Sequence, residues 1–278
     1  MRADRRNWRV LRALLACVVL LVMLFPLYWM VIASTNRPDE LLSRVLLPQH
    51  PSLDAYAAVL AQPFFWLYAR NSLLIASGVC VGSVGVSALA AYALARLPFA
   101  GSKWISRFIL FAYIVPPVLL VVPMFVVLSR VGLVNTPLGL VIAEMAFAVP
   151  FCTWLLRGFF LSLPPELEDA ALVDGCTQFG AFRHVVLPLA RPGLVAAGMF
   201  AFLIAWNDYL YPTVFLRSES QYTLPVGIQV RFFVADMTPD YWVQLLAASF
   251  MAAIPVLLLF IGLQRWMVSG LSAGSVKG

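Results

Sequence analysis

Six long apolar stretches constrain this chain more than any other feature of its sequence. They cover about residues 11–34, 71–95, 106–129, 137–160, 193–216 and 244–268. A helix needs roughly 20 residues, at about 1.5 Å each, to cross about 30 Å of hydrocarbon. Lipid offers no partners to backbone N–H and C=O groups, and these stretches lack the alternating pattern of a membrane barrel. The sequence therefore predicts an all-α, polytopic membrane protein with six transmembrane helices.

The composition excludes several other classes of protein. Apolar residues make up 62% of the 278 positions and charged residues only 12%, about half the charged fraction of a soluble domain. The four cysteines form no Cys-x-x-Cys pair, and His50 and His184 are predicted on opposite sides of the membrane. We therefore expect one transmembrane domain over residues 1–278, without a metal site, a disulfide or the clustered side chains of a membrane-embedded enzyme.

The positions of the basic residues predict the orientation of the chain. If the N-terminus is cytoplasmic, 13 of the 19 Lys and Arg residues fall in cytoplasmic segments and 6 in external segments. Cytoplasmic loops of membrane proteins carry such an excess. With six spans, both termini are then cytoplasmic, and the net charge of +6 reflects topology rather than affinity for nucleic acid.

The most informative connection, residues 162–192, joins the fourth and fifth spans on the cytoplasmic side. Ser162 can cap a first helix, and Pro164 and Pro165 suit its first turn. Acidic residues near its start favour the positive end of the helix dipole. Gly175 suits the left-handed residue that follows the last turn.

A second short helix is predicted directly after the first. Thr177 caps it and Pro188 ends it. Small residues on one face of the first helix permit close approach to another surface, while Phe179 and Phe182 supply area to be buried in that contact. From shape alone, a docking element and a hairpin that packs on its own spans are equal alternatives.

The sequence Glu-Asp-Ala-Ala-Leu-Val-Asp-Gly-Cys, followed by Leu-Pro, resembles the coupling loop of permease subunits of binding-protein-dependent ABC importers. Cys176 replaces the small alanine usual in that loop. The resemblance implies that the loop inserts into a cleft on a separate nucleotide-binding subunit and has a mechanical rather than a catalytic role. The residues that would make this contact are Glu168, Asp169, Ala170, Ala171, Asp174, Gly175, Phe179, Phe182, Leu187 and Pro188.

Other stretches are similar to carbohydrate permeases, in particular to the second, shorter permease of maltose-type systems. They are the runs from Phe25 to Trp29, Ala91 to Leu97, Trp206 to Tyr209, Leu224 to Gly227 and Gly270 to Gly278. This resemblance implies a type I ABC importer permease fold in a bacterial-type cell membrane, and alternating access within a heterodimer with a second permease. It also implies a pair of ATPase subunits and an extracytoplasmic substrate-binding protein. Permeases for glycerol phosphate, amino acids or peptides are the nearer alternatives.

The chain itself has no means of hydrolysing ATP. Lys103 and Lys277 are its only lysines, and neither stands in a Gly-x-x-x-x-Gly-Lys-Ser/Thr loop. We therefore expect no cofactor in this chain, with ATP and Mg²⁺ bound by the partner ATPase. The rival class is an ion-coupled secondary transporter, which would predict charged relays in several spans and often an internal repeat.

Two acidic residues lie within predicted spans, where a carboxylate normally faces a cavity or a partner. Counted from the external ends of their spans, Glu144 lies about 10 Å deep and Asp208 about 12 Å deep. Their similar depth predicts a shared polar cavity; the alternative is that both only brace helix ends. The candidate residues of the translocation pathway are Glu144, Trp206, Asn207, Asp208, Tyr209 and Tyr211.

Overall fold

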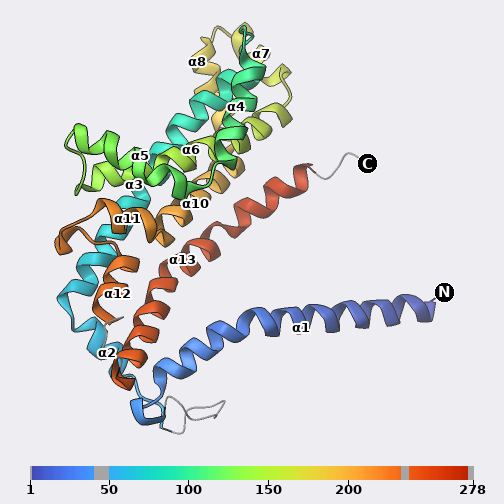
Figure 1. Cartoon of the computed structure of the whole chain (residues 1–278). Helices are drawn as coiled ribbons and strands as arrows, with labels where there is room; N and C mark the ends of the chain where they lie inside the picture. The colour runs from blue at the N-terminus through green and yellow to red at the C-terminus, as the bar shows by residue number, and fades with distance from the viewer. Residues whose placement is uncertain (1, 41–49, 233–237, 275–278) are drawn as a thin grey trace. The chain divides into compact units, whose positions relative to one another are not determined.

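The computed structural model describes residues 2–40, 50–232 and 238–274, and within these ranges the chain forms helices, turns and loops but no strand (Figure 1). Part of the predicted C-terminal resemblance, residues 275–278, lies outside the described residues. The all-α prediction is confirmed.

Four helices are long and apolar enough to cross a membrane, and two bent helix pairs raise the number to six if each pair counts as one span. The four continuous helices coincide with the predicted first, second, fourth and sixth spans. They are α1 (Arg2–Thr35), α3 (Pro63–Arg96), α6 (Pro137–Ser162) and α13 (Pro239–Gly274).

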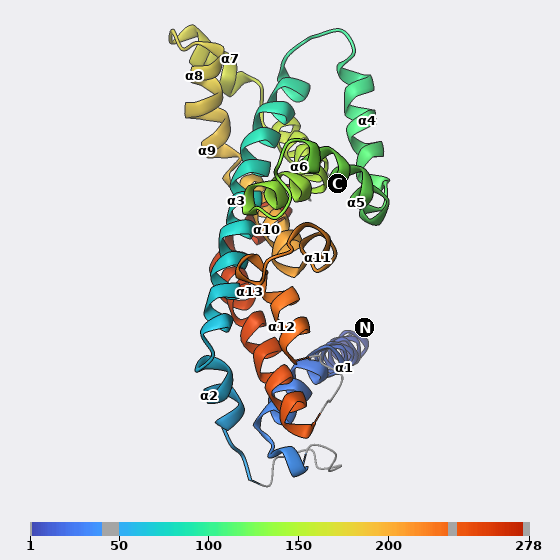
Figure 2. The same ribbon diagram turned by 60° about the vertical axis from the view of Figure 1, so that its left-hand side comes forward.

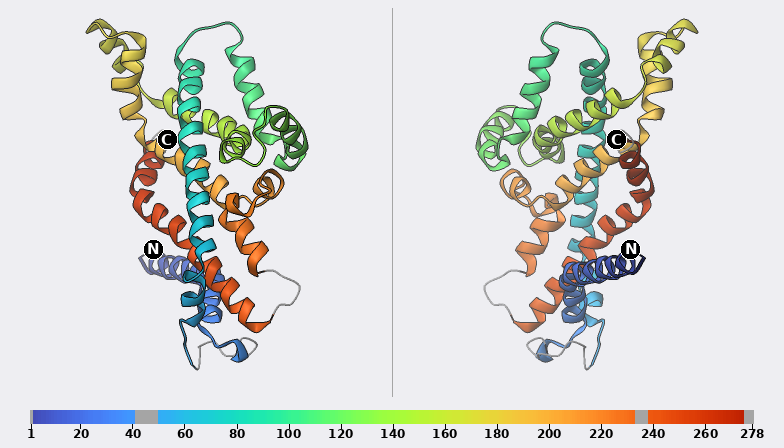
Figure 3. Two further views of the ribbon diagram at one scale, coloured as in Figure 1. Left: turned by 90° about the vertical axis from the view of Figure 1, so that its left-hand side faces the viewer. Right: turned by 90° about the vertical axis from the view of Figure 1, so that its right-hand side faces the viewer.

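The predicted third span is broken by proline. α4 (Ser102–Ile114) and α5 (Pro117–Arg130) meet at an angle of 101°. The break falls at Val115 and Pro116, because a proline disfavours helical geometry in the residue before it and cannot donate a backbone hydrogen bond. The change of direction between the two helices can be followed in Figure 3.

The predicted fifth span, residues 193–216, is not one continuous helix, and that expectation is wrong. α10 (Arg191–Asn207) ends before Asp208, whose backbone is extended, and a short α11 (Leu210–Phe215) follows. Tyr209 is the N-cap of α11 and makes no side-chain cap, while the Asp208 side chain accepts a hydrogen bond from the amide of Leu210, the first residue of α11 (2.9 Å). The other bent pair joins Gln178–Leu189 to α10 at 78°.

The chain forms two compact units, and three helices (α3, α12 and α13) continue from one unit into the other. Whether the two units act as the single permease domain predicted above stays a prediction. The first unit comprises Met1–Trp66 and Ile228–Ile254. In it, Ser34 at the end of α1 shares a hydrogen bond of 2.6 Å with Tyr56 of α2 (Asp54–Leu60). The first unit also contains η1 (Pro38–Glu40), most of α12 (Leu224–Phe232) and the first part of α13.

The second unit comprises Leu67–Gly227 and Pro255–Gly278, and its core lies between α6 and α10. Gly193 lets α10 approach the Phe159 ring of α6, where an added Cβ atom would lie 2.6 Å from the ring. Leu156 and Phe160 of α6 are fully buried in this core. A short helix η3 (Glu219–Gln221) follows α11 in this unit. Figure 2 shows the short helices that follow α6 together at one end of the unit. They are α7 (Glu166–Val173), α8 (Gln178–Ala181), the π-helical η2 (Phe182–Val186) and α9 (Leu187–Leu189).

Candidate coupling loop and solute pocket

The connection between α6 and α10 begins with α7, largely as its sequence predicts. Three acidic residues occupy its first turn, and Gly175 ends it with a left-handed φ of +90°. The predicted cap is wrong. Ser162 is still the last residue of α6, where its hydroxyl donates to the Phe159 carbonyl (2.7 Å), and Pro165 at the N-cap position makes no side-chain cap.

The second helix starts where predicted but ends later. The Thr177 hydroxyl accepts a hydrogen bond from the Gly180 amide (3.1 Å), which confirms the cap. Pro188 does not end the helix: the helical turns continue to Leu189 through the π-helical η2. A widened turn of this kind can accommodate a proline, which has no backbone N–H to donate to the preceding turn.

The two helices bury one face and expose another. Glu168 (5% exposed) and Ala171 (8%) are buried, as are Ala181 and Phe182. In contrast, Val173 is 87% exposed and Phe179 is 61% exposed within this chain. That Phe179 supplies area buried against another surface stays a prediction. The hairpin therefore combines a firm attachment to its own unit with an uncovered apolar surface.

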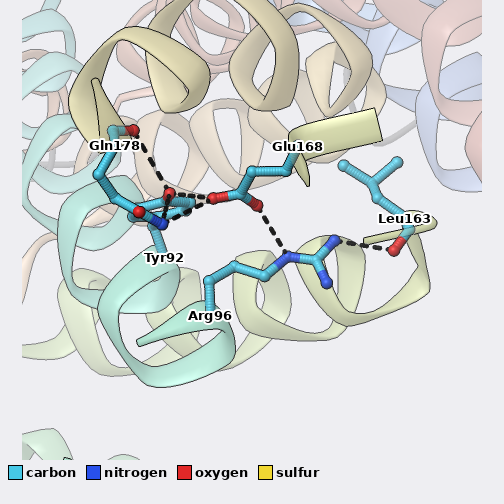
Figure 4. A network of polar contacts seen from close by, with 5 residues as sticks. All are labelled: Tyr92, Arg96, Leu163, Glu168 and Gln178. Atoms are coloured by element: carbon cyan, nitrogen blue, oxygen red, sulfur yellow. Dashed lines mark hydrogen bonds and ion pairs between the residues drawn. The ribbon is translucent and has the colours of Figure 1, made fainter. Parts of the chain in front are cut away.

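A buried polar cluster makes that attachment, and Glu168 is its centre (Figure 4). The Glu168 carboxylate accepts hydrogen bonds from the Tyr92 hydroxyl and from the Gln178 side-chain amide (3.1 Å). Its other oxygen pairs with Arg96 Nε at 3.4 Å. Arg96 also donates to the Leu163 carbonyl at 2.8 Å. Because Tyr92 and Arg96 lie in the last turns of α3, the cluster ties the hairpin to the end of that helix.

Aromatic contacts support the same attachment. The ring of Tyr92 lies 4.5 Å from that of Phe182 and 6.3 Å from that of Phe160 (centroid distances). Sequence reasoning missed Tyr92, Arg96 and Gln178 as members of the site. One signal was present: Arg96 stands at the predicted cytoplasmic end of a predicted span, on the same predicted side as the acidic loop.

All ten residues predicted for ATPase coupling belong to this hairpin, but not to one surface. Glu168, Ala171 and Phe182 are buried, and Leu187 and Pro188 are partly covered. The exposed members, which a partner could reach, are Asp169, Ala170, Asp174, Gly175 and Phe179. Contact of these residues with an ATPase stays a prediction.

A cavity of about 370 Å³ lies between the break that separates α4 from α5 and the break that separates α10 from α11. Val115 and Pro117 line it from the break between α4 and α5, and Asp208 and Leu210 from the break between α10 and α11. The Tyr211 hydroxyl donates to the Pro117 carbonyl (3.0 Å) and so links the two breaks. The whole lining consists of Ala112, Tyr113, Val115, Pro117, Phe147, Phe200, Ile204, Asn207, Asp208, Leu210 and Tyr211.

Three of the six residues predicted for the pathway line this cavity: Asn207, Asp208 and Tyr211. The other three do not. Trp206 is buried and stacks on Phe202 at 5.6 Å, while Tyr209 is exposed outside the lining.

Glu144 lies on α6, three residues before Phe147, and is fully buried. Neither of its carboxylate oxygens has a hydrogen-bond partner among the residues that the structure describes. It does not line the cavity, so it and Asp208 do not share one solvent-accessible wall.

Within the described ranges, no group of three or more His, Cys, Asp or Glu residues is placed to hold a metal ion. The four cysteines are free thiols, and Cys176 is exposed on the hairpin. The features that remain are a helical hairpin anchored by buried charges and a pocket between broken apolar helices.

Such an arrangement defines a multi-span membrane transport subunit. The comparison with known proteins is more specific: residues 83–272 match the family described as binding-protein-dependent transport system inner membrane component. The chain belongs to this family.

Curated relatives extend the match to nearly the whole chain. The inner membrane ABC transporter permease protein YcjP of Escherichia coli is 36% identical, over 93% of this chain and 93% of its own length. The trehalose/maltose transport system permease protein MalG of Thermococcus litoralis is 33% identical over 97% of both chains. The diacetylchitobiose uptake system permease protein DasC of Streptomyces coelicolor is 34% identical over 95% of both.

A solved structure confirms the predicted type of fold. A chain of a bacterial ABC transporter involved in the import of the acidic polysaccharide alginate superposes with a TM-score of 0.81. The two chains are 24% identical, and the match covers 95% of this chain and 98% of the other. At this identity, the likeness concerns the fold alone.

Proposed function

We propose that this chain is a permease subunit of an ATP-driven importer and translocates a sugar or sugar-like solute into the cytoplasm by alternating access. The observation that carries the proposal is the hairpin of α7 to α9, which the Glu168 cluster ties to the end of α3. A hairpin held in this way passes a force applied to its outer surface to a long apolar helix. This is the mechanical role that the coupling-loop resemblance implies.

The partner at the outer surface of the hairpin is a pair of nucleotide-binding ATPase subunits. Val173 and Phe179 present an apolar contact surface, flanked by the exposed carboxylates of Asp169 and Asp174. Apolar and aromatic side chains of this kind form the centres of protein interfaces. ATP and Mg²⁺ bind to these partner subunits, and no catalytic residue is assigned to this chain.

A second permease and an external binding protein complete the proposed assembly. The apolar side chains of α1, such as Leu21 (71% exposed) and Met23 (70%), are uncovered within this chain and available to lipid or to a second permease. The family name refers to dependence on a binding protein, and the excess of Lys and Arg in one set of loops supports an orientation with the hairpin and both termini in the cytoplasm.

The carbohydrate substrate is supported by the relatives. Their names refer to trehalose and maltose, diacetylchitobiose, and sulfoquinovosyl glycerol, the last for a permease of Agrobacterium fabrum that is 35% identical over 96% of this chain. Aromatic rings next to an amide and a carboxylate, as in the cavity, suit the apolar ring faces and hydroxyl groups of a sugar.

Co-purification tests the coupling surface. The tagged chain is isolated in mild detergent, and its partners are identified by mass spectrometry. We expect an ATPase and a second permease with the wild type, and loss of the ATPase alone with Val173→Glu, because a charge then occupies the apolar contact. Val131→Glu, at a 63% exposed position after α5, is the matched control and retains both partners. Failure of the wild type to recover a nucleotide-binding protein would contradict the proposal.

A further inference from the structure

We propose that the cavity at the two helix breaks is a solute subsite for neutral or positively charged sugar rings, and that Asp208 makes it disfavour anionic sugars. This inference rests on the proposed function and adds the charge of the solute. The fold does not determine that charge, since a chain of similar fold belongs to a transporter that imports an acidic polysaccharide.

The hydrogen-bonding groups of the cavity are mainly acceptors. Asp208 Oδ1 accepts a hydrogen bond from the Leu210 amide, and a carboxylate has about four acceptor positions, so capacity remains for a ligand. Asn207 donates one N–H to the Leu203 carbonyl (2.8 Å), which leaves its side-chain carbonyl and a second N–H. Hydroxyl and ammonium groups donate to such acceptors, whereas carboxylate, phosphate and sulfonate groups do not.

The rest of the wall offers aromatic and aliphatic surface. Phe147 and Tyr211 stand edge to face at 4.9 Å, and Tyr113 and Phe200 complete the aromatic part of the lining. The C–H faces of a sugar ring pack on such rings. The volume of about 370 Å³ falls in the range of roughly 300–1,000 Å³ typical of small-molecule sites.

The electrostatics of the cavity oppose an anion. The lining residues given above include no Lys, Arg or His, and Asp208 is the one acidic residue among them. Helix starts often bind anions, but α5 begins with Pro116 and Pro117, which have no N–H groups. The ends of α4 and α10 at the same breaks carry partial negative charge. A carboxylate on the solute would therefore meet repulsion from Asp208, against which the lining offers only neutral donors such as the second N–H of Asn207.

The test measures binding of three matched probes to the full chain in phosphatidylcholine nanodiscs. Glucose, glucosamine and glucuronate share one ring and carry charges of 0, +1 and −1 at neutral pH. Saturation-transfer-difference NMR detects weak binding and gives an apparent dissociation constant for each probe. We expect glucosamine and glucose to bind about tenfold or more tightly than glucuronate at low ionic strength, with the difference shrinking as salt is added.

Two variants assign the preference to the cavity. Asp208→Asn keeps an oxygen that can accept from the Leu210 amide and removes the charge, so the three dissociation constants should converge to within about twofold. Asn207→Asp adds a second charge and should widen the difference between glucosamine and glucuronate. Asp54→Asn, an exposed acidic position in the first turn of α2, is the control and should change nothing.

Equal binding of the three probes to the wild type, or no binding of any, would overturn the inference. An unchanged preference in Asp208→Asn would overturn the role of that residue. These results are independent of the proposed function, which is judged by recovery of the ATPase. An importer that recovers its ATPase but shows no charge preference would refute this subsite alone.

Discussion

Replacing Glu168 by Gln should release the α7 to α9 hairpin from α3. The variant keeps the shape of the side chain but removes the negative charge that faces Arg96 Nε at 3.4 Å and accepts from Tyr92 and Gln178. It also replaces one carboxylate oxygen by an NH2 group, which is a donor. This NH2 group then faces either the Arg96 guanidinium or the other donors of the cluster.

The size of the effect follows from the burial of the pair. The side chains of Arg96 and Glu168 are 12% and 7% exposed. Hydrogen bonds to a charged group contribute about 1.5–3 kcal/mol, and removing one partner of a fully buried pair costs about 3–5 kcal/mol. With this residual exposure, we expect the free energy that holds the hairpin in place to fall by about 2–3 kcal/mol. This corresponds to about a 30- to 150-fold increase in the population of the released hairpin.

Hydrogen–deuterium exchange measures this population directly. Amides of α7 and α8 should exchange about 30 to 150 times faster in Glu168→Gln, while amides in the middle of α10 keep their wild-type rates. Glu166→Gln, two residues earlier and exposed, is the matched control and should stay within about 0.5 kcal/mol of wild type. In the assembled transporter, solute uptake should fall more than ATP hydrolysis, because the ATPase no longer moves α3. Equal exchange in the variant and the control would refute the anchoring role of Glu168.

Two further predictions concern the packing of the second unit. Gly193→Ala should lower the free energy of unfolding by about 1–3 kcal/mol, because the added Cβ would lie 2.6 Å from the Phe159 ring. Gly262→Ala, with open space around it, is the control and should leave the free energy of unfolding unchanged. Equal melting temperatures of the two variants would contradict this prediction. Asn135→Ala should lower stability by about 2 kcal/mol or more. It removes side-chain hydrogen bonds to Ser218 (2.8 and 3.0 Å) and places alanine at a φ of +61°, and faster exchange of the Ser218 amide would check it.

The sequence predicts much of this fold because lipid leaves few choices to an apolar chain. Runs of about 20 apolar residues must be helical, and the four continuous helices coincide with such runs. Local signals were also sufficient at Thr177 and Gly175, where a side-chain oxygen and a missing Cβ atom determine a cap and a turn.

The departures arise where local signals compete or where contacts are distant. The apolar run around Asp208 favours one span, but the backbone at Asp208 is extended and divides the run into α10 and α11. Ser162 is as good a cap as Thr177 in sequence, yet α6 includes it. In the Glu168 cluster, Tyr92 and Glu168 are 76 positions apart in the chain. No local sequence pattern encodes a contact over that separation.

The most direct test of the account is uptake by proteoliposomes that contain this chain with its co-purified partners and the substrate-binding protein. We predict that a radiolabelled sugar recognised by the binding protein accumulates only when ATP and Mg²⁺ are present on the side of the hairpin, and that ionophores leave its rate unchanged. Uptake that proceeds without ATP and collapses when an ionophore removes the ion gradient would contradict the account and identify an ion-coupled transporter.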